Sequence, residues 1–184
     1  MSPAEPVVAY FRANTVYCGD AKEVLGRFPE GSVDLIYLDP PFFSNRVYEV
    51  IWKDGSEIRS FEDRWKGGIN NYVSWLMERV GQCYRVLKST GSLYIHLDDH
   101  ASHYVKVELD KLFGEARFIN EIIWSRQLGR HSGARQYGRG HDSILFYAKG
   151  EEYTWNQQYQ PYSQEYLNHF YKYTCLLYTS PSPR

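Results

Sequence analysis

The residues most suited to chemistry are four in a row, Asp39-Pro40-Pro41-Phe42, which directly follow the apolar run at positions 33–38. Such a run between turn residues predicts a strand buried on both faces of a parallel sheet, and ligands bind outside the carboxyl ends of such strands. Two prolines remove two N–H donors, so the turn offers only acceptors, the Asp39 carboxylate and the Pro40 carbonyl. This edge is complementary to an amino group.

The amino group of a nucleobase is a poor nucleophile because its lone pair is delocalised into the ring. Two acceptors that draw its hydrogens toward tetrahedral geometry would localise that lone pair for attack on an electrophilic methyl group. Phe42 could hold the base by stacking, an interaction worth ~1–3 kcal/mol per base. The competing interpretation is a strand-terminating turn in which Asp39 caps its own backbone, and the four residues alone do not decide between the two.

Basic side chains gather in one segment, residues 125–140, which contains no acidic residue. Its arginines could neutralise DNA phosphates while neighbouring glycines let the backbone conform. A run of charge is also typical of a solvated surface. The candidate DNA contacts are Arg126, Arg130, Arg135 and Arg139.

Composition excludes several classes of protein. The 184 residues are 43% hydrophobic and 23% charged, which is globular and not disordered, and a net charge of -1 excludes a uniformly basic nucleic-acid binder. The three cysteines, at positions 18, 83 and 175, form no CxxC pair, and no His/Cys/Asp cluster stands at metal-ligand spacing. No apolar run approaches the length of a membrane span. We therefore expect a cytoplasmic protein without a metal.

The elements that must position these residues alternate between strand and helix. Asp20 is placed to cap a helix over residues 21–28 through Glu23, and residues 43–70 form a long loop, with or without a short helix. The helix over 71–88 has its apolar positions three and four apart. The other expected elements are strands over 15–18, 33–38, 92–97, 118–124 and 143–147 and a helix from Asp98 to Phe113. This order predicts an α/β domain whose open, mainly parallel sheet is flanked by helices.

Several of these segments, taken together, resemble the amino-terminal half of the amino-group DNA methyltransferases. They are Gly19-Asp20, residues 32–42, 85–88 and 91–96, and the later strands at 118–124 and 141–147. The early Asp-Pro-Pro-Phe resembles the beta-type arrangement of type III modification subunits. The resemblance implies the Rossmann-like methyltransferase fold and methyl transfer from S-adenosylmethionine to adenine N6, an acidic first residue favouring adenine. Cytosine N4 methylation and a non-catalytic DNA-binding subunit are the alternatives.

The resemblance also implies roles for individual residues. Asp39 and the Pro40 carbonyl would hold the target amino group, Pro41 would stiffen the turn, and Phe42 would stack on a base flipped out of double-stranded DNA. Asp20 would lie near the adenosyl part of the cofactor or serve only as the helix cap, and Asp39 would be a second cofactor-binding residue. His96 would line the pocket or merely pack. A restriction subunit or a second copy is a possible partner.

The ends of the chain carry separate expectations. Residues 1–13 are interpreted as an extension, 14–158 as the amino-terminal part of the catalytic domain, and 159–174 as the start of a target-recognition region or a surface helix. Residues 175–184 resemble translated sequencing adapter. The aromatic-Gly-x-Gly cofactor motif of the family has no match, so we expect a carboxyl-terminal truncation and poor cofactor binding by this chain alone.

Overall fold

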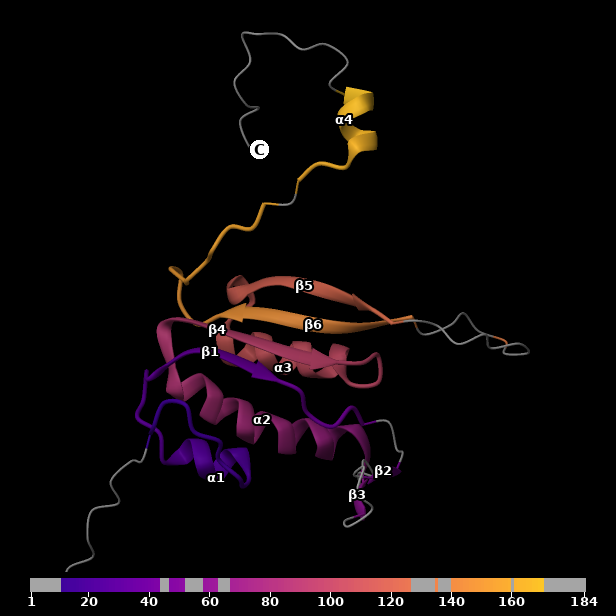
Figure 1. The fold of residues 1–184 in the computed structure, drawn as a ribbon. Helices are drawn as coiled ribbons and strands as arrows, with labels where there is room; N and C mark the ends of the chain where they lie inside the picture. The colour runs from indigo at the N-terminus through magenta and orange to yellow at the C-terminus, as the bar shows by residue number, and fades with distance from the viewer. Residues whose placement is uncertain are drawn as a thin grey trace, which may run out of the picture. The chain divides into compact units, whose positions relative to one another are not determined.

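The computed structural model describes residues 11–43, 47–51, 58–62, 67–126, 135, 140–159 and 161–170. Contacts divide the chain into two units, Met1–Thr154 and Trp155–Arg184. Among the described residues, the first unit contains a four-stranded sheet, a two-stranded sheet and three α-helices, and the second contains α4, Gln164–Phe170 (Figure 1). None of the described helices is long and apolar enough to cross a membrane.

The sheet has four strands in the order β1-β4-β6-β5, which are Val33–Leu38, Leu87–Leu97, His141–Ala148 and Phe118–Ser125 (Figure 1). The predicted α/β class is confirmed, but the prediction that the sheet is mainly parallel is wrong. β1 pairs with β4 in parallel, whereas β6 pairs antiparallel with both β4 and β5. Parallel neighbours need a crossover connection, usually a helix, and the sequence between β5 and β6 has no helical apolar pattern. β6 therefore returns against the strand that precedes it.

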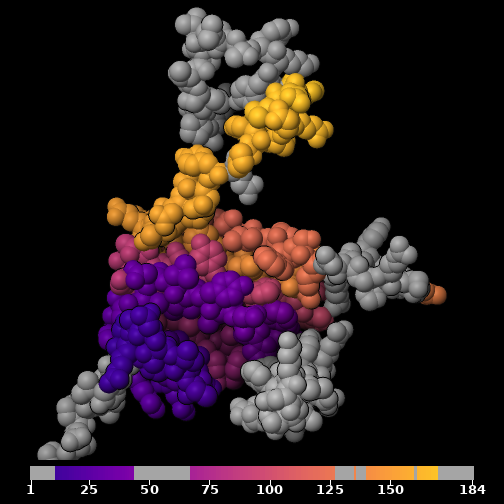
Figure 2. Space-filling model, in the orientation of Figure 1, coloured from indigo at the N-terminus to yellow at the C-terminus, as the bar shows by residue number. Residues whose placement is uncertain are grey.

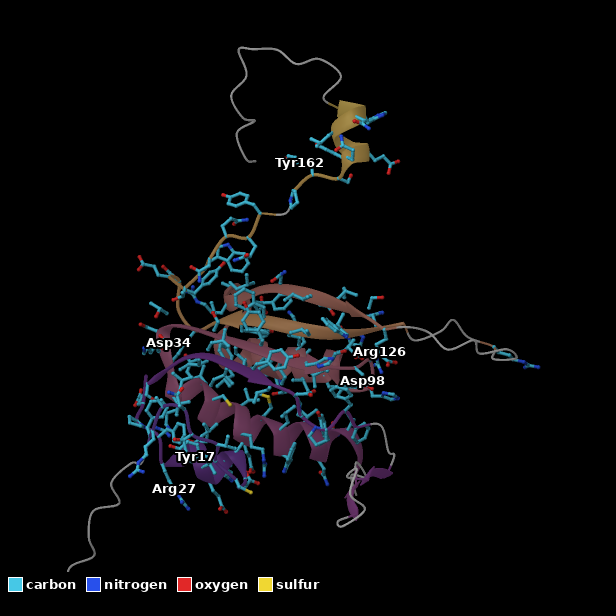
Figure 3. The ribbon with its side chains drawn as sticks, viewed as in Figure 1. Tyr17, Arg27, Asp34, Asp98, Arg126 and Tyr162 are labelled. Atoms are coloured by element: carbon cyan, nitrogen blue, oxygen red, sulfur yellow. The ribbon has the colours of Figure 1, made fainter. Side chains whose placement is uncertain are left out.

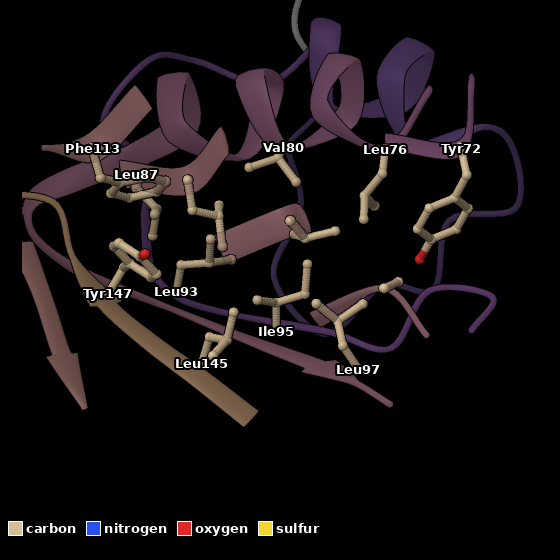
Figure 4. Packing of buried hydrophobic residues seen from close by; sticks show 13 residues of the cluster. Tyr72, Leu76, Val80, Leu87, Leu93, Ile95, Leu97, Phe113, Leu145 and Tyr147 are labelled. Carbon is tan, nitrogen blue, oxygen red and sulfur yellow. The ribbon is translucent and has the colours of Figure 1, made fainter. Parts of the chain in front are cut away.

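Two helices, α2 (Gly68–Val86) and α3 (Ser102–Phe113), cover one face of this sheet. Figure 4 shows the core between the helices and the sheet, with Leu76 and Val80 reaching from α2 toward Leu93 and Ile95 of β4. Burying each aliphatic side chain of this size contributes roughly 1.5–3 kcal/mol. The buried positions of α2 are Tyr72, Leu76, Val80, Cys83 and Val86.

The opposite face of β1 corrects the expectation of a strand buried on both faces. Ile36 and Leu38 pack against the core, but Leu35 and Tyr37 are 59% and 53% exposed. Strand side chains alternate between faces, and the helices cover only one of them. β1 also lies at the edge of the four-stranded sheet, and purple atoms of its segment form part of the visible surface in Figure 2.

Other elements also differ from the expectations. Residues 15–18 form no strand and are exposed. The expected loop 43–70 contains an antiparallel pair, β2 (Val47–Ile51) with β3 (Ile58–Glu62), and the first three residues of α2. The first helix, α1, is Ala21–Gly26, and α3 begins at Ser102, four residues after the expected start. A short 3₁₀ turn, Glu115–Arg117, leads into β5.

Candidate functional site at the carboxyl end of β1

The Asp39–Phe42 segment begins where β1 ends, beside the carboxyl end of β4. The parallel register pairs Leu38 with Ile95, so Asp39 comes next to His96. The Asp39 side chain is 63% exposed, and Pro40, Pro41 and Phe42 are half-buried. The predicted placement of this segment at a strand end is therefore what the structure has, with an accessible carboxylate.

Tyr72 of α2 holds the backbone of this segment. Its side chain is fully buried, and its hydroxyl donates a hydrogen bond of 2.6 Å to the Pro41 carbonyl. Its ring also contacts the ring of Phe43, at 5.5 Å between centroids. Phe43 has a φ of +57°, in the left-handed region that costs a non-glycine residue on the order of 1–3 kcal/mol. Tyr72 thus stabilises this turn through the Pro41 carbonyl and the Phe43 ring. The Pro40 carbonyl, which is the one predicted to accept from a substrate, is not the acceptor of this hydrogen bond.

His96, at the end of β4, contacts two members of the segment. Its Nδ1 lies 3.4 Å from Oδ1 of Asp39, and its ring meets the ring of Phe42 edge-on, at 5.1 Å between centroids. The carboxylate, the aromatic ring and the imidazole therefore form one cluster. Of the two interpretations of His96, packing and a place at the candidate site, the structure supports both at once.

Asp20 lies in a separate cluster around α1. Its carboxylate accepts a hydrogen bond of 2.8 Å from the Lys22 amide and pairs with the Arg79 guanidinium. It therefore caps the helix as predicted, although the amide belongs to Lys22 and not to Glu23. The hydrogen bond from Arg79 holds the pKa of Asp20 below its ordinary value, so this half-exposed carboxylate is ionised at neutral pH. Arg85 fixes the same helix by donating to the carbonyls of Leu25 and Phe28.

An apolar cavity of about 450 Å³ lies beside Asp20. Its walls come from the segment before α1, from α1 itself and from β1, and include Tyr17, Gly19, Phe28, Ile36 and Leu38. A larger groove of about 600 Å³ runs between α2 and α3 and is lined by Val73, Met77, Tyr104 and Val107 among others. None of the predicted site residues that the structure describes lines this groove, so the larger hollow is separate from the Asp39 and Asp20 clusters.

The predicted DNA-binding arginines are only partly described. The Arg126 guanidinium pairs with the buried carboxylate of Asp142, and the Arg126 amide donates to the Gly140 carbonyl at 2.7 Å. Arg126 and Asp98 lie at the same end of the sheet in Figure 3. Arg135 is exposed, and Arg130 and Arg139 lie outside the described residues. Arg126 thus has a partner within the chain.

Asp98, Asp99 and His100 correct the sequence argument that no cluster of possible metal ligands exists. One ligand atom from each lies within 4.8 Å of the others. Asp98 accepts from the His100 amide at 3.0 Å and meets its ring at 2.7 Å, and its backbone carbonyl accepts from Ser102 at 3.0 Å. These contacts are those of a turn that leads into α3.

Sequence reasoning missed two residues of the site, Tyr72 and Asp142. Tyr72 stands four positions before Leu76, so the helical period of the buried stripe could have found it. Asp142 is one acidic residue beside an apolar strand, and only the pairing of β6 with β4 and β5 places it near His96 and Arg126.

The chain is similar to known DNA methyltransferases. It is 31% identical over 153 residues to the DNA adenine methyltransferase YhdJ of Escherichia coli K12, covering 83% of this chain and 47% of that protein. It is 25% identical over 178 residues to the Mod subunit of the type III restriction-modification enzyme StyLTI of Salmonella typhimurium, covering 86% of this chain and 27% of the subunit. The chain thus spans less than half the length of these relatives.

The solved structure of the PvuII DNA methyltransferase, described as cytosine-N4-specific, matches with a TM-score of 0.52 at 17% identity. The match covers 83% of this chain and 60% of that one. This likeness confirms the methyltransferase fold. The family model for N6 and N4 methyltransferases, described as DNA methylase, matches residues 33–181, which include the Asp39–Phe42 segment and the His96 cluster. Since this match takes in most of the chain, the chain belongs to the N6/N4 DNA methylase family.

Proposed function

We propose that the complete protein carrying these residues transfers a methyl group from S-adenosylmethionine to the N6 amino group of adenine in double-stranded DNA. The observation that carries this proposal is the exposed Asp39 carboxylate at the end of β1, beside the half-buried ring of Phe42. Tyr72 of α2 fixes the backbone between Asp39 and Phe42, because its hydroxyl donates to the Pro41 carbonyl. The activity is assigned to the complete protein because the chain spans 47% of YhdJ and 27% of the Mod subunit.

The proposed chemistry follows from the Asp39 carboxylate and the Pro40 carbonyl, which accept hydrogen bonds and donate none. An ionised carboxylate and a proline carbonyl accept the two hydrogens of an amino group, which leaves the nitrogen lone pair directed at the incoming methyl group. The target base must leave the duplex, which costs a few kcal/mol, and stacking on Phe42 offsets about 1–3 kcal/mol of this. After transfer, the amino nitrogen loses one proton, for which the Asp39 carboxylate is the adjacent acceptor.

Asp20 is the residue proposed to hold the cofactor. Its carboxylate is ionised and half-exposed, and each carboxylate oxygen can accept more than the one bond that Lys22 or Arg79 makes with it. It would accept hydrogen bonds from hydroxyl or amino groups of the adenosyl part. When bound, S-adenosylmethionine supplies the electrophilic methyl group. No residue in this scheme requires a metal.

DNA is the proposed macromolecular partner. The positive charge comes from the segment that contains Arg126, Arg130, Arg135 and Arg139, and residues 159–174 would begin the target-recognition region. Tyr162 and Tyr166 in that region stack at 4.8 Å between centroids and are about half exposed, which suits contact with bases. A restriction subunit, a homodimer and a cytoplasmic location are further predictions.

Two candidate functions, adenine N6 and cytosine N4 methylation, differ in the base that receives the methyl group. Adenine is favoured by the acidic first residue of the segment and by the name of YhdJ, whereas the PvuII enzyme is cytosine-N4-specific. Incubation of the complete protein with DNA and labelled S-adenosylmethionine, followed by nucleoside mass spectrometry, distinguishes N6-methyladenine from N4-methylcytosine. We expect N6-methyladenine.

The catalytic role of Asp39 is tested in the same assay. The gene is first read through the codon for Tyr173 by an adapter-free method, which defines the complete protein. Asp39→Ala should then abolish methyl transfer while DNA binding is retained. The matched control is Asp34→Ala, which removes an exposed carboxylate of β1 that pairs with Lys88. A wild-type protein that binds DNA but modifies neither base would instead establish the non-catalytic DNA-binding subunit.

A further inference from the structure

His96 lies between two carboxylates that come from different strands. Its Nδ1 is 3.4 Å from Asp39 Oδ1, and its Nε2 is 3.2 Å from Asp142 Oδ2. The strand register explains both contacts: Asp39 follows Leu38, the partner of Ile95, and Asp142 lies one residue before Ser143, the partner of Leu97. Both carboxylates therefore lie beside His96 on neighbouring strands.

Burial changes steadily along this series of groups. The side chain of Asp142 is 5% exposed, that of His96 17%, and that of Asp39 63%. A buried carboxylate needs a partner, and Asp142 has the guanidinium of Arg126. Asp142 is thereby a fixed, buried anchor, and Asp39 is the end that solvent or a substrate reaches.

The imidazole is the group that joins the anchor to the exposed end. Nε2 is buried and, among the described residues, makes no hydrogen bond, and Oδ2 of Asp142 lies 3.2 Å from it. The two ring nitrogens therefore face two carboxylates, Asp39 at 3.4 Å from Nδ1 and Asp142 at 3.2 Å from Nε2. The same ring meets Phe42 edge-on. One side chain therefore contacts both the carboxylate and the aromatic ring of the candidate site.

Asp39 has few other restraints. Within the described part of the chain, His96 is the only group that forms an ion pair or hydrogen bond with its side chain. An exposed aspartate on a turn would otherwise sample several rotamers. We propose that His96 is a positioning residue for methyl transfer, which holds Asp39 in the orientation that accepts the target amino group and is itself held by Asp142. This inference rests on the function proposed above.

The kinetic test uses the complete protein with His96→Ala, His96→Asn and Asp142→Asn. We expect kcat to fall about 10–100-fold in His96→Ala, because small misplacements of a reacting group cost up to roughly 100-fold. The dissociation constants for DNA and for S-adenosylmethionine should change by less than about threefold. His96→Asn retains one donor and should recover part of kcat, and Asp142→Asn should lose less than His96→Ala. His103→Ala on α3, an exposed histidine, is the control and should leave kcat unchanged.

A second measurement does not depend on turnover. The ¹⁵N signals of the His96 ring should shift in Asp39→Asn and in Asp142→Asn, and remain in place in Asp34→Asn. The double variant His96→Ala/Asp142→Asn should be no slower than His96→Ala, since the two residues act as one unit. Should His96→Ala not fold, as judged by thermal unfolding, the comparison of His96→Asn with Asp142→Asn takes its place.

The outcomes separate the two proposals. If the wild-type protein methylates neither adenine nor cytosine, the proposed function fails and this inference with it. If the wild-type protein is active but the His96 variants keep the wild-type kcat, or the ring signals do not respond to Asp39→Asn, only the positioning role is overturned.

Discussion

Tyr72→Phe removes one hydroxyl from a ring that stays in place. The lost group donates to the Pro41 carbonyl at 2.6 Å, while the ring contacts with Phe43 and Trp75 are retained. A net hydrogen bond contributes about 0.5–1.5 kcal/mol, and a buried acceptor left unpaired costs about 1–3 kcal/mol. Pro41 is half-buried, so water can reach its carbonyl, and the expected loss is roughly 1 kcal/mol.

This loss is measurable in two assays. For a protein of this size, a loss of 1 kcal/mol lowers Tm by about 2–4 °C. In the complete protein we also expect a roughly tenfold fall in kcat, because the left-handed turn at Phe43 loses a restraint next to Phe42. The matched control is Tyr84→Phe on the same helix, whose hydroxyl makes no side-chain hydrogen bond among the described residues and whose ring packs on Phe113. Equal Tm and kcat in the two variants would refute the role assigned to Tyr72.

Three further predictions concern the helix cap, the core and the DNA contact. Asp20→Asn should destabilise the chain at pH 7 and not in strong acid. The pKa of Asp20 is lower in the folded chain than in the unfolded chain, so its contribution to stability is present above the unfolded pKa and is lost as the pH falls through the folded pKa. Thermal unfolding measured at several pH values checks this. Ile95→Ala, fully buried, should cost about 2–5 kcal/mol in urea unfolding, against less than about 0.5 kcal/mol for Val107→Ala, which is 52% exposed. Charge reversal at Arg130 and Arg135 in the complete protein should weaken DNA binding and flatten its dependence on salt, as titrations at several salt concentrations would show.

Local patterns in the sequence identified most of the main elements. The apolar run over 33–38 and the helical period of α2 are both long enough to be unambiguous, and the structure contains β1 and α2 at these places. The β2–β3 pair was missed because each strand has only five residues and the segment has no clear period. The prediction of a mainly parallel sheet was wrong because β6 pairs antiparallel with β4 and β5. The direction in which two strands pair depends on contacts between distant residues, and the pattern within one strand does not determine it.

The same distinction applies to the site. Asp39–Phe42 could be proposed as the candidate site from the sequence because its four residues are consecutive and their acceptors can be counted without knowledge of contacts. His96, Tyr72 and Asp142 come from β4, α2 and β6, and only the fold brings them to that segment. Arg126 shows the same limit: the basic segment predicts a DNA contact, but nothing local in the sequence indicates the ion pair with Asp142, which is 16 positions away.

By strand alternation, Asp39 and His96 of the candidate site lie on the side of their strands that faces away from α2 and α3. Leu93 and Ile95 point into the core beneath these helices, and His96 and Tyr94 alternate with them. Leu35 and Tyr37, on the same open face and in the strand that leads to Asp39, are more than half exposed. Apolar area left in water forgoes about 25 cal/mol per Å², so a segment or partner that covered these residues would be stabilised by them and would make the surroundings of Asp39 less polar. Hydrogen bonds to a carboxylate strengthen as water is excluded, and the complete protein is therefore the form in which His96 and Asp39 should be assayed.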